Sequence, residues 1–406
     1  MPTDRTDARK INRDQAVGGC PVIRNADGVW LVRDYAAARA ALRSPYTVQA
    51  GLGVETLDNL PARIRRPVLY RDGPEHREHR RQTARFFTPR RVDESYRGFI
   101  GDLADRQLAV LRDNGRADFA DLAFGLAIGV VCSVIGLTES RPGLTRRLER
   151  FFPEEFGSPG FTTVDGLYWM WRQARNWSSI FLSDVRPAVR ARRVRRRDDL
   201  ISHLLDEGCS SVEILGECIT FAAAGMVTTR EYITVAAWHL FTDEPLRDRY
   251  RTAEEPERIA ILHEILRLEP VVAHLLRRTT APVELPGDGR SVTVDPGQLI
   301  DIDIAATNTD RAAVGDSPLT LCLARPRTDA TAPVLSFGDG PHKCPGATIA
   351  IVETDIFLSK LLAMPGVRLH SPPRVGANDA IGGYTLRNMI VEADTPNGQR
   401  DRAGEH

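Results

Sequence analysis

The sequence predicts a mainly α-helical protein with a smaller β-rich lobe. Most of residues 95–200 follow a helical pattern, and two apolar stretches at 212–240 and 347–362 carry the three- and four-residue spacing of a helix. Short alternating stretches, such as residues 28–33, indicate strands between the helices. We therefore expect a large helical domain with a small β-rich lobe.

One large domain is the simplest organisation of the 406 residues. Length alone favours two or three domains, but no Gly/Ser/Pro-rich linker and no internal repeat divides the chain. We expect a flexible N-terminal segment at 1–20, a single domain at 21–397 and a polar C-terminal tail at 398–406.

Composition indicates a soluble, cytoplasmic protein without a general affinity for nucleic acid or membrane. Lys+Arg and Asp+Glu both number 54, and the arginine-rich stretch 186–197 is interpreted as a solvated helix end rather than a nucleic-acid-binding arm. The six cysteines form no CxxC pair, which favours a reducing compartment. No signal-peptide core and no run of eighteen apolar residues is present, so no membrane anchor is expected.

The first candidate site residues follow an irregular stretch at 46–70. Asp72 is a plausible N-cap for the next helix. On that helix His76 and Arg80 are four residues apart and share one face. A metal site built on His76 and His79 is disfavoured, because no third ligand lies near in the sequence.

The long apolar helix at 212–240 is interrupted by small and hydroxyl-bearing residues at 222–229. Small side chains in the middle of a helix permit the close approach of a ligand. Thr228 and Thr229 can also bond back to preceding carbonyls and bend the helix. Further on, Glu264 and Arg267 share a helix face, although such a pair alone is a weak signal.

A Gly-rich segment at 336–346 contains Cys344 and leads directly into the helix at 347–362. Its glycines let the backbone approach a flat, bulky group, and the helix N-terminus favours a thiolate. A haem held by one axial thiolate needs this arrangement. A buried structural cysteine in a Gly-rich turn is the alternative.

This segment, Phe-Gly-x-Gly-x-His-x-Cys-x-Gly, resembles the haem-binding loop of the cytochrome P450 family of haem-thiolate monooxygenases. Further matches follow the family's order along the chain, in a His-x-x-x-Arg pair, an Ala-Gly-x-x-Thr segment and a Glu-x-x-Arg pair. The resemblance implies the cytochrome P450 fold and a haem b (iron protoporphyrin IX) with an axial thiolate.

The resemblance also implies roles for individual residues, with Cys344 as the iron ligand. Cofactor contacts are expected from His76, Arg80, Arg277, Phe337, Gly338, His342, Cys344 and Gly346, with Arg278 as an alternative to Arg277. The oxygen-activating group would comprise Ala224, Gly225, Thr228 and Glu231. A structural network would join Glu264, Arg267 and Arg325. The substrate pocket would contain Met226, Val227, Val272, His274 and Tyr384, together with the stretches 46–70 and 151–170.

Two positions depart from the family pattern. Val227 stands where the family has an acid, and valine cannot relay a proton. Glu231, one turn further on, is a candidate replacement, although a surface or structural carboxylate fits equally well. Pro345 follows the cysteine where leucine is common; proline suits a helix start but removes an N–H that could bond the sulfur.

From the resemblance we expect a monomeric oxidoreductase that acts on a mid-sized organic molecule, such as a secondary metabolite. It would use O2 and electrons from a ferredoxin-type partner, and it would bind neither nucleic acid nor membrane. Because of Val227, oxidative coupling, cyclisation or peroxide-driven oxidation remains the alternative within enzymes. A catalytically silent binding relative is the alternative outside them.

Overall fold

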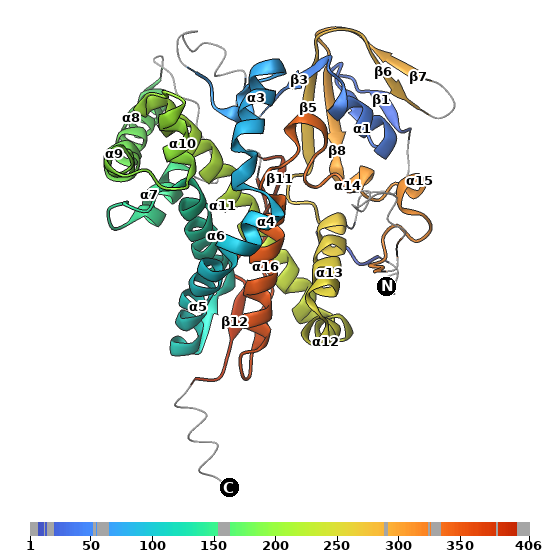
Figure 1. Cartoon of the computed structure of the whole chain (residues 1–406). Coiled ribbons are helices and arrows are strands. Elements are labelled where there is room, and N and C mark those ends of the chain that lie inside the picture. Colours follow the sequence, from blue (N-terminus) through green and yellow to red (C-terminus); the bar gives the residue numbers. More distant parts are fainter. Residues whose placement is uncertain are drawn as a thin grey trace.

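The computed structural model describes residues 7–11, 13, 20–51, 54, 65–152, 163–287, 291–323, 325, 334–378 and 381–395. The tail expected at 398–406, residues 52–53 and 55–64 of the stretch 46–70, and residues 153–162 of the expected substrate roof lie outside these residues. Figure 1 shows the helices filling the greater part of the molecule, with β1, β3 and β5–β8 gathered on one side and β12 beside α16.

Helices dominate the chain, as predicted. The first half contains α1 (Tyr35–Arg43), α3 (Gly73–Thr83), α4 (Pro89–Arg91), α5 (Arg97–Asn114), α6 (Phe119–Ile135), α7 (Leu144–Phe151), α8 (Val164–Ile180), α9 (Arg186–Val194) and α10 (Leu200–Asp206). The second half contains α11 (Ser211–Thr242), α12 (Glu244–Thr252), α13 (Glu255–Leu268), α14 (Ile304–Thr307), α15 (Arg311–Val314) and α16 (Ala347–Leu362).

The strands form small sheets. The largest has the order β1-β2-β8-β5-β3, from β1 (Val22–Arg24), β2 (Trp30–Val32), β8 (Leu299–Asp303), β5 (His274–Thr279) and β3 (Thr47–Gln49). The expected hairpin at 283–294 is present as β6 (Val283–Pro286) and β7 (Ser291–Val294). The remaining strands are β4 (Arg116–Asp118), β9 (Arg368–Ser371), β10 (Arg374–Asn378), β11 (Gly383–Arg387) and β12 (Ile390–Glu392).

Helix α11 is the central element of the helical part (Figure 1). It begins with a capping box in which Ser210 and Glu213 satisfy each other's backbone N–H groups. It packs against α6, α16 and α13, and its inward residues such as Ile233 and Leu240 are fully buried. These contacts bury apolar side chains of the main core, which is the dominant stabilising contribution to such a fold.

The structure differs from the sequence prediction at α11 in one respect. The stretch 222–229 does not interrupt the helix, which continues from Ser211 to Thr242. Thr228 does bond back to the carbonyl of Ala224, and the helix continues through this position without a break.

Two further expectations concern the N-terminus and membranes. Within the segment expected to be flexible, the backbone N–H groups of Lys10 and Ile11 donate to the buried Glu269 carboxylate.

Within the part of the chain that the structure describes, α11 is the helix long and apolar enough to cross a membrane. Half of its most apolar window is buried inside the fold, as in the core helix of a soluble protein.

Candidate active site

The Gly-rich loop before α16 is closed by its own backbone. Cys344 N–H donates to the carbonyl of Phe337 at 2.8 Å, and Gly338 N–H donates to Leu335. Gly340 has φ +68°, and a Cβ there would lie 2.3 Å from the carbonyl oxygen of Leu42. Only glycine fits this position, so the loop lies tightly against the end of α1.

The Cys344 side chain is accessible at the surface of the loop although protein surrounds it on most sides. Burial raises the pKa of this thiol, while the backbone N–H groups of Gly346 and Ala347 and the charge of Arg80 oppose that shift. The backbone N–H groups at the start of α16 therefore favour the thiolate, as expected, although burial outweighs their effect on the pKa. Coordination to a metal ion removes the proton outright.

Helix α3 brings His76 to this loop. The imidazole rings of His76 and His342 stack with centroids 4.1 Å apart and an interplanar angle of 16°. His342 Nε2 lies 2.8 Å from Asp72 Oδ1. Burial, together with the nearby His342 and Arg80, lowers the pKa of His76 to about 4, so this imidazole is neutral near pH 7.

Asp72 occupies the N-cap position of α3, as predicted, but its side chain does not cap the helix. Its other oxygen accepts from Gln49 N–H in β3 at 3.2 Å. The carboxylate therefore joins α3, β3 and the Gly-rich loop.

Two further cations predicted for cofactor binding lie at the same place. Arg80 Nη2 donates to the carbonyl of Lys343, next to the cysteine, at 2.6 Å. Arg277 is buried and donates to Gln49 Oε1 at 2.8 Å, and burial lowers its pKa to about 10. Arg278 is exposed and bonds to Gly297 O, so the structure favours Arg277 over its neighbour.

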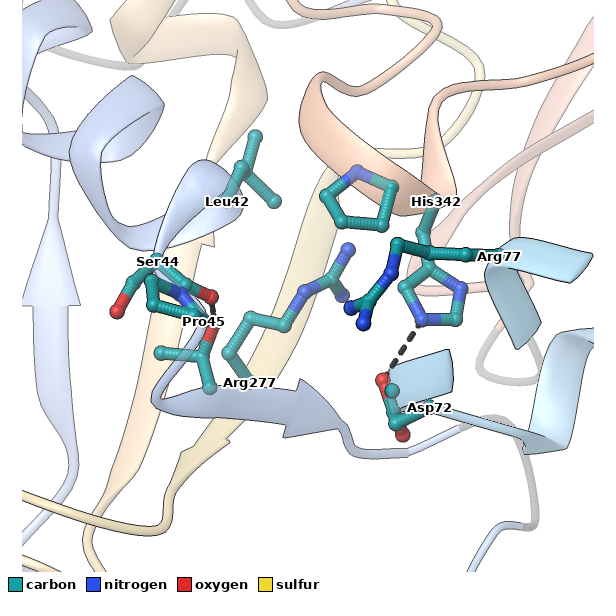
Figure 2. A pocket seen from close by; sticks show the side chains of 10 residues that line it. Leu42, Ser44, Pro45, Asp72, Arg77, Arg277 and His342 are labelled. Carbon is teal, nitrogen blue, oxygen red and sulfur yellow. Dashed lines mark hydrogen bonds and ion pairs between the residues drawn. The ribbon is translucent and has the colours of Figure 1, made fainter. Parts of the chain in front are cut away.

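A cavity of about 50 Å³ opens between β3, α3 and the Gly-rich loop (Figure 2). The side chains of Arg77 and Arg277 both extend toward it, together with His342. Asp72 is the one acid among its lining residues. Two guanidinium groups facing one small cavity fit an anionic group such as a carboxylate. Sequence reasoning missed Arg77, because the cavity that it lines forms only when α3, β3 and the Gly-rich loop come together.

The predicted oxygen-activating residues lie on α11. Ala224 is exposed, Gly225 and Thr228 are partly accessible, and Thr228 Oγ1 donates to Ala224 O at 2.6 Å. A Cβ on Gly225 would lie 3.0 Å from Val131 Cγ2, so the glycine permits close packing against α6. An accessible methyl and hydroxyl in mid-helix suit contact with a ligand.

The environment of Glu231 does not suit a replacement for the acid that the family has at the position of Val227. It is fully buried and accepts hydrogen bonds from Leu386 N–H at 2.7 Å and from Arg387 at 2.8 Å. Arg230 donates to it as well. These bonds join α11 to β11, so the carboxylate has a structural environment.

The residues expected in the substrate pocket fall into two groups. Met226 is fully buried in the core formed with α6, α9 and α10, and Tyr384 is buried with its hydroxyl donating to Glu269 O. Neither side chain is placed to contact a substrate. Val227 and Val272 are partly accessible, and His274 is exposed and pairs with Asp301 at 2.8 Å.

The structure brings together the three residues of the expected network. Arg267 Nε donates to Glu264 Oε1 at 2.8 Å, and Arg325 Nε lies 3.4 Å from Glu264 Oε2. Arg267 also donates to three carbonyls, of Asn308, Pro318 and Thr320. The network fixes the chain that leads toward the Gly-rich loop.

One buried acid went unnoticed in the sequence. Glu353 on α16 is 3% exposed, and its Oε2 has no hydrogen-bond partner among the described residues. Burial raises its pKa well above the ordinary value, against a smaller opposing effect of the Thr229 hydroxyl. Burial therefore favours the protonated form of Glu353, whose carboxyl interacts with Thr229, the residue after Thr228.

Comparison with known proteins agrees with this geometry. Residues 259–365 match the family model described as Cytochrome P450. Cytochrome P450 109 of Bacillus spizizenii is 27% identical over 343 residues, which cover 82% of this chain and 78% of the relative. Mycinamicin IV hydroxylase/epoxidase of Micromonospora griseorubida is 28% identical over 355 residues, 84% of each chain.

Solved structures show the same fold. CalO2 superimposes with a TM-score of 0.75 at 24% identity, covering 92% of this chain and 93% of that one. P450BioI, solved in complex with an acyl carrier protein ligated to hexadec-9Z-enoic acid, gives a TM-score of 0.74 at 22% identity and covers 92% and 95%.

A helical fold with an accessible cysteine before α16 and a cluster of cations beside it defines a haem-thiolate protein. The chain belongs to the cytochrome P450 family and is an oxidoreductase of the monooxygenase type. Its cofactor is haem, which members of this family bind through a cysteine thiolate.

Proposed function

We propose that this enzyme oxidises a mid-sized organic substrate of the secondary-metabolite kind, with O2 and two electrons from a ferredoxin-type partner. The observation that carries the proposal is the accessible Cys344, joined through Arg80 and the His76–His342 stack to α3. Relatives named as a mycinamicin IV hydroxylase/epoxidase and an erythromycin C-12 hydroxylase support the substrate class. We further propose that the enzyme is a monomer and that it acts in the cytoplasm.

The residues present fit a haem. Cys344 Sγ would ligate the iron, and Phe337, Gly338 and Gly346 would line the loop beneath it. The propionates would be held by His76, Arg77, Arg80, Arg277 and His342, where cations and N–H donors stabilise buried carboxylates. When bound, haem supplies the iron at which oxygen is activated.

Thr228 would order water at the reacting oxygen. The Thr228 hydroxyl donates its hydrogen bond to the Ala224 carbonyl. The lone pairs of Oγ1 therefore remain available to accept a hydrogen bond from water. Val227 contributes only an apolar surface beside this hydroxyl. A proton must therefore arrive from another residue.

We assign proton supply to Glu353, through Thr229. Burial raises the pKa of the Glu353 carboxyl well above its ordinary value, which favours the protonated form, and this carboxyl interacts with the hydroxyl of Thr229, the residue next to Thr228. A hydroxyl can accept a proton from the acid on one side and donate its own on the other, so charge moves without displacing either side chain.

Oxidative coupling, cyclisation or peroxide-driven oxidation is the second candidate. Val227 favours it, and so does the structural environment of Glu231, because no acid stands in the usual position on α11. Hydrogen peroxide is oxygen already reduced by two electrons, so a peroxide-driven reaction would not need two electrons from a partner protein.

Turnover with isotopic oxygen tests the proposal. Holoenzyme, a bacterial ferredoxin, its reductase and NADPH would be incubated under ¹⁸O2 with macrolide and other secondary-metabolite candidates first chosen by spectral titration. We expect ¹⁸O in the product only when the electron donors are present. Turnover by hydrogen peroxide alone, or product without ¹⁸O, would overturn it in favour of the second candidate. Haem binding without turnover by either route would identify a silent relative.

A further inference from the structure

The Gly-rich loop and α1 are joined by an ion cluster centred on Asp339. Arg39 Nε donates to Asp339 Oδ2 at 2.9 Å. Arg43 donates to both carboxylate oxygens, from Nε at 2.8 Å and from Nη2 at 3.2 Å. The two arginines are four residues apart on α1 and therefore share one face of the helix. One carboxylate of the loop thus holds the last two turns of α1.

The same carboxylate also shapes the loop from within. Asp339 Oδ1 accepts from the backbone N–H of Gly340 at 2.8 Å and so caps the short 3-10 turn Gly340–His342. Burial alone would raise the pKa of Asp339, but hydrogen bonds, that of Arg43 foremost, hold it below its ordinary value. The group that fixes the turn of His342 is therefore an ionised carboxylate near pH 7.

The end of α1 forms one wall of the cavity, and the loop forms another. Figure 2 shows Ser44 and Pro45 on one side of the Arg277 side chain and His342 on the other. Because Asp339 bonds α1 from within the loop, its hydrogen bonds join these two walls.

The wall at α1 is also linked to Arg277, through β3. Thr47, the first residue of β3, donates from its hydroxyl to the carbonyl of Ala41 at 2.8 Å. Two residues further on, Gln49 Oε1 accepts from Arg277 Nη1 at 2.8 Å. A shift of α1 against the loop would therefore move Arg277 relative to His342.

The two arginines of the cluster remain in contact with water. Their side chains are 35% and 53% exposed for Arg39 and Arg43, against 14% for Asp339. Ion pairs with such exposed partners contribute little to the free energy of unfolding. Loss of the cluster would leave no fully buried cation unpaired, in contrast to the loss of Glu264 beside Arg267. The cluster therefore suits the positioning of one structural element on another better than stabilisation of the whole fold.

We propose that Asp339 is a positioning residue for the cofactor: by holding α1 to the Gly-rich loop, it sets the separation of Arg277 and His342 across the cavity. It acts through these two residues rather than by contact with the cofactor. The inference rests on the proposed role of the cavity in holding a haem propionate.

Transfer of haem from the holoenzyme to apomyoglobin tests the proposal. Asp339→Asn keeps an oxygen that can accept from Gly340 N–H but removes the charge that attracts the arginines. We expect haem release to become about three- to tenfold faster, as for the loss of two partly exposed ion pairs. Glu78→Gln, which breaks an exposed ion pair on α3, is the matched control and should release haem at the wild-type rate.

A double-mutant cycle with Arg277→Ala separates positioning from a general loosening of the loop. Without the Arg277 guanidinium, the separation of the two walls matters little to the bound carboxylate, so adding Asp339→Asn should change release by less than about twofold. In the Arg278→Ala background, Asp339→Asn should keep its full effect. Effects that multiply in the Arg277→Ala background would overturn the proposal, because Asp339 would then act independently of Arg277.

Arg39→Gln combined with Arg43→Gln approaches the cluster from α1 and provides the test if Asp339→Asn does not fold. This double variant should also release haem faster than wild type, and its reduced carbon monoxide complex should keep the wild-type absorption band. Loss of that band would overturn the proposal, because the loop around Cys344 would then be disturbed. Wild-type release from these variants, with faster release from Arg277→Ala, would overturn the positioning role alone. Wild-type release from Arg277→Ala would instead refute the propionate site on which the inference rests.

Discussion

The imidazole of His76 stacks on that of His342, at 4.1 Å between centroids, although the two residues belong to α3 and to the loop before α16. Asp72 Oδ1 lies 2.8 Å from Nε2 of the same His342 ring. The stack therefore places α3 and the cysteine loop in a fixed relation, with the cavity of Arg77 and Arg277 beside it (Figure 2). The contact between α3 and the cysteine loop thus brings together the cations that would hold the cofactor.

Arg277→Ala should weaken haem retention. The guanidinium is buried beside the cavity, and a charged hydrogen bond to a carboxylate contributes about 1.5–3 kcal/mol, so haem should dissociate about ten- to a hundredfold more readily. Transfer of haem to apomyoglobin measures this. Arg278→Ala, at the exposed neighbouring position, is the control and should release haem at the wild-type rate.

Glu264→Gln should destabilise the fold by about 3 kcal/mol, because it leaves Arg267 buried without its anionic partner. Urea unfolding of the holoenzyme measures the difference, and Glu78→Gln on the exposed face of α3 should change the free energy of unfolding little. A loss no larger than that of the control would show that the network contributes little.

The difference in the free energy of unfolding between wild type and Glu264→Gln should depend on pH. Burial alone would raise the pKa of Glu264, but the hydrogen bonds and charge of Arg267 hold it below the ordinary 4.5. A carboxylate with a depressed folded pKa stabilises the protein above about pH 4.5, and the contribution is lost as pH falls through the folded value. The stability gap between wild type and Glu264→Gln should be constant above pH 5 and narrow in acid.

Glu353→Gln should uncouple electron use from product formation if Glu353 supplies the proton. NADPH consumption would continue while product per NADPH falls several-fold, and the solvent isotope effect on product formation should change. Thr354→Val, a buried neighbour on α16 whose hydroxyl bonds only the Ala350 carbonyl among described residues, is the control. Equal coupling in wild type and Glu353→Gln would contradict this role.

Pro345→Leu should raise the haem reduction potential. Proline supplies no N–H, and the sulfur already receives those of Gly346 and Ala347. An added donor withdraws electron density from the thiolate. Spectroelectrochemical titration measures the potential, with Pro341→Ala in the same loop as control. A potential that is unchanged or lowered by the substitution would contradict the argument.

Helices with a strong apolar pattern were predictable from the sequence, and α16 has the predicted bounds. The cysteine, the His76–Arg80 pair and the Glu264–Arg267 pair were also visible as local spacings, because each lies on one element or in one loop. Arg325, outside α13, was expected only from the family resemblance. Arg77 and Glu353 were not, since their importance comes from a cavity and from a neighbour on another helix. Met226 and Tyr384 were placed in the pocket because the sequence does not reveal which side of an apolar element faces the core.

The absorption spectrum of the reduced carbon monoxide complex tests the central claim, that Cys344 holds the haem. Wild type and Cys322→Ser should both show the strongly red-shifted Soret band of a thiolate ligand, because Cys322 lies outside the Gly-rich loop. Cys344→His should bind haem but lose that band. A red-shifted band that persists in Cys344→His would contradict the assignment, and so would its absence in freshly reduced wild type.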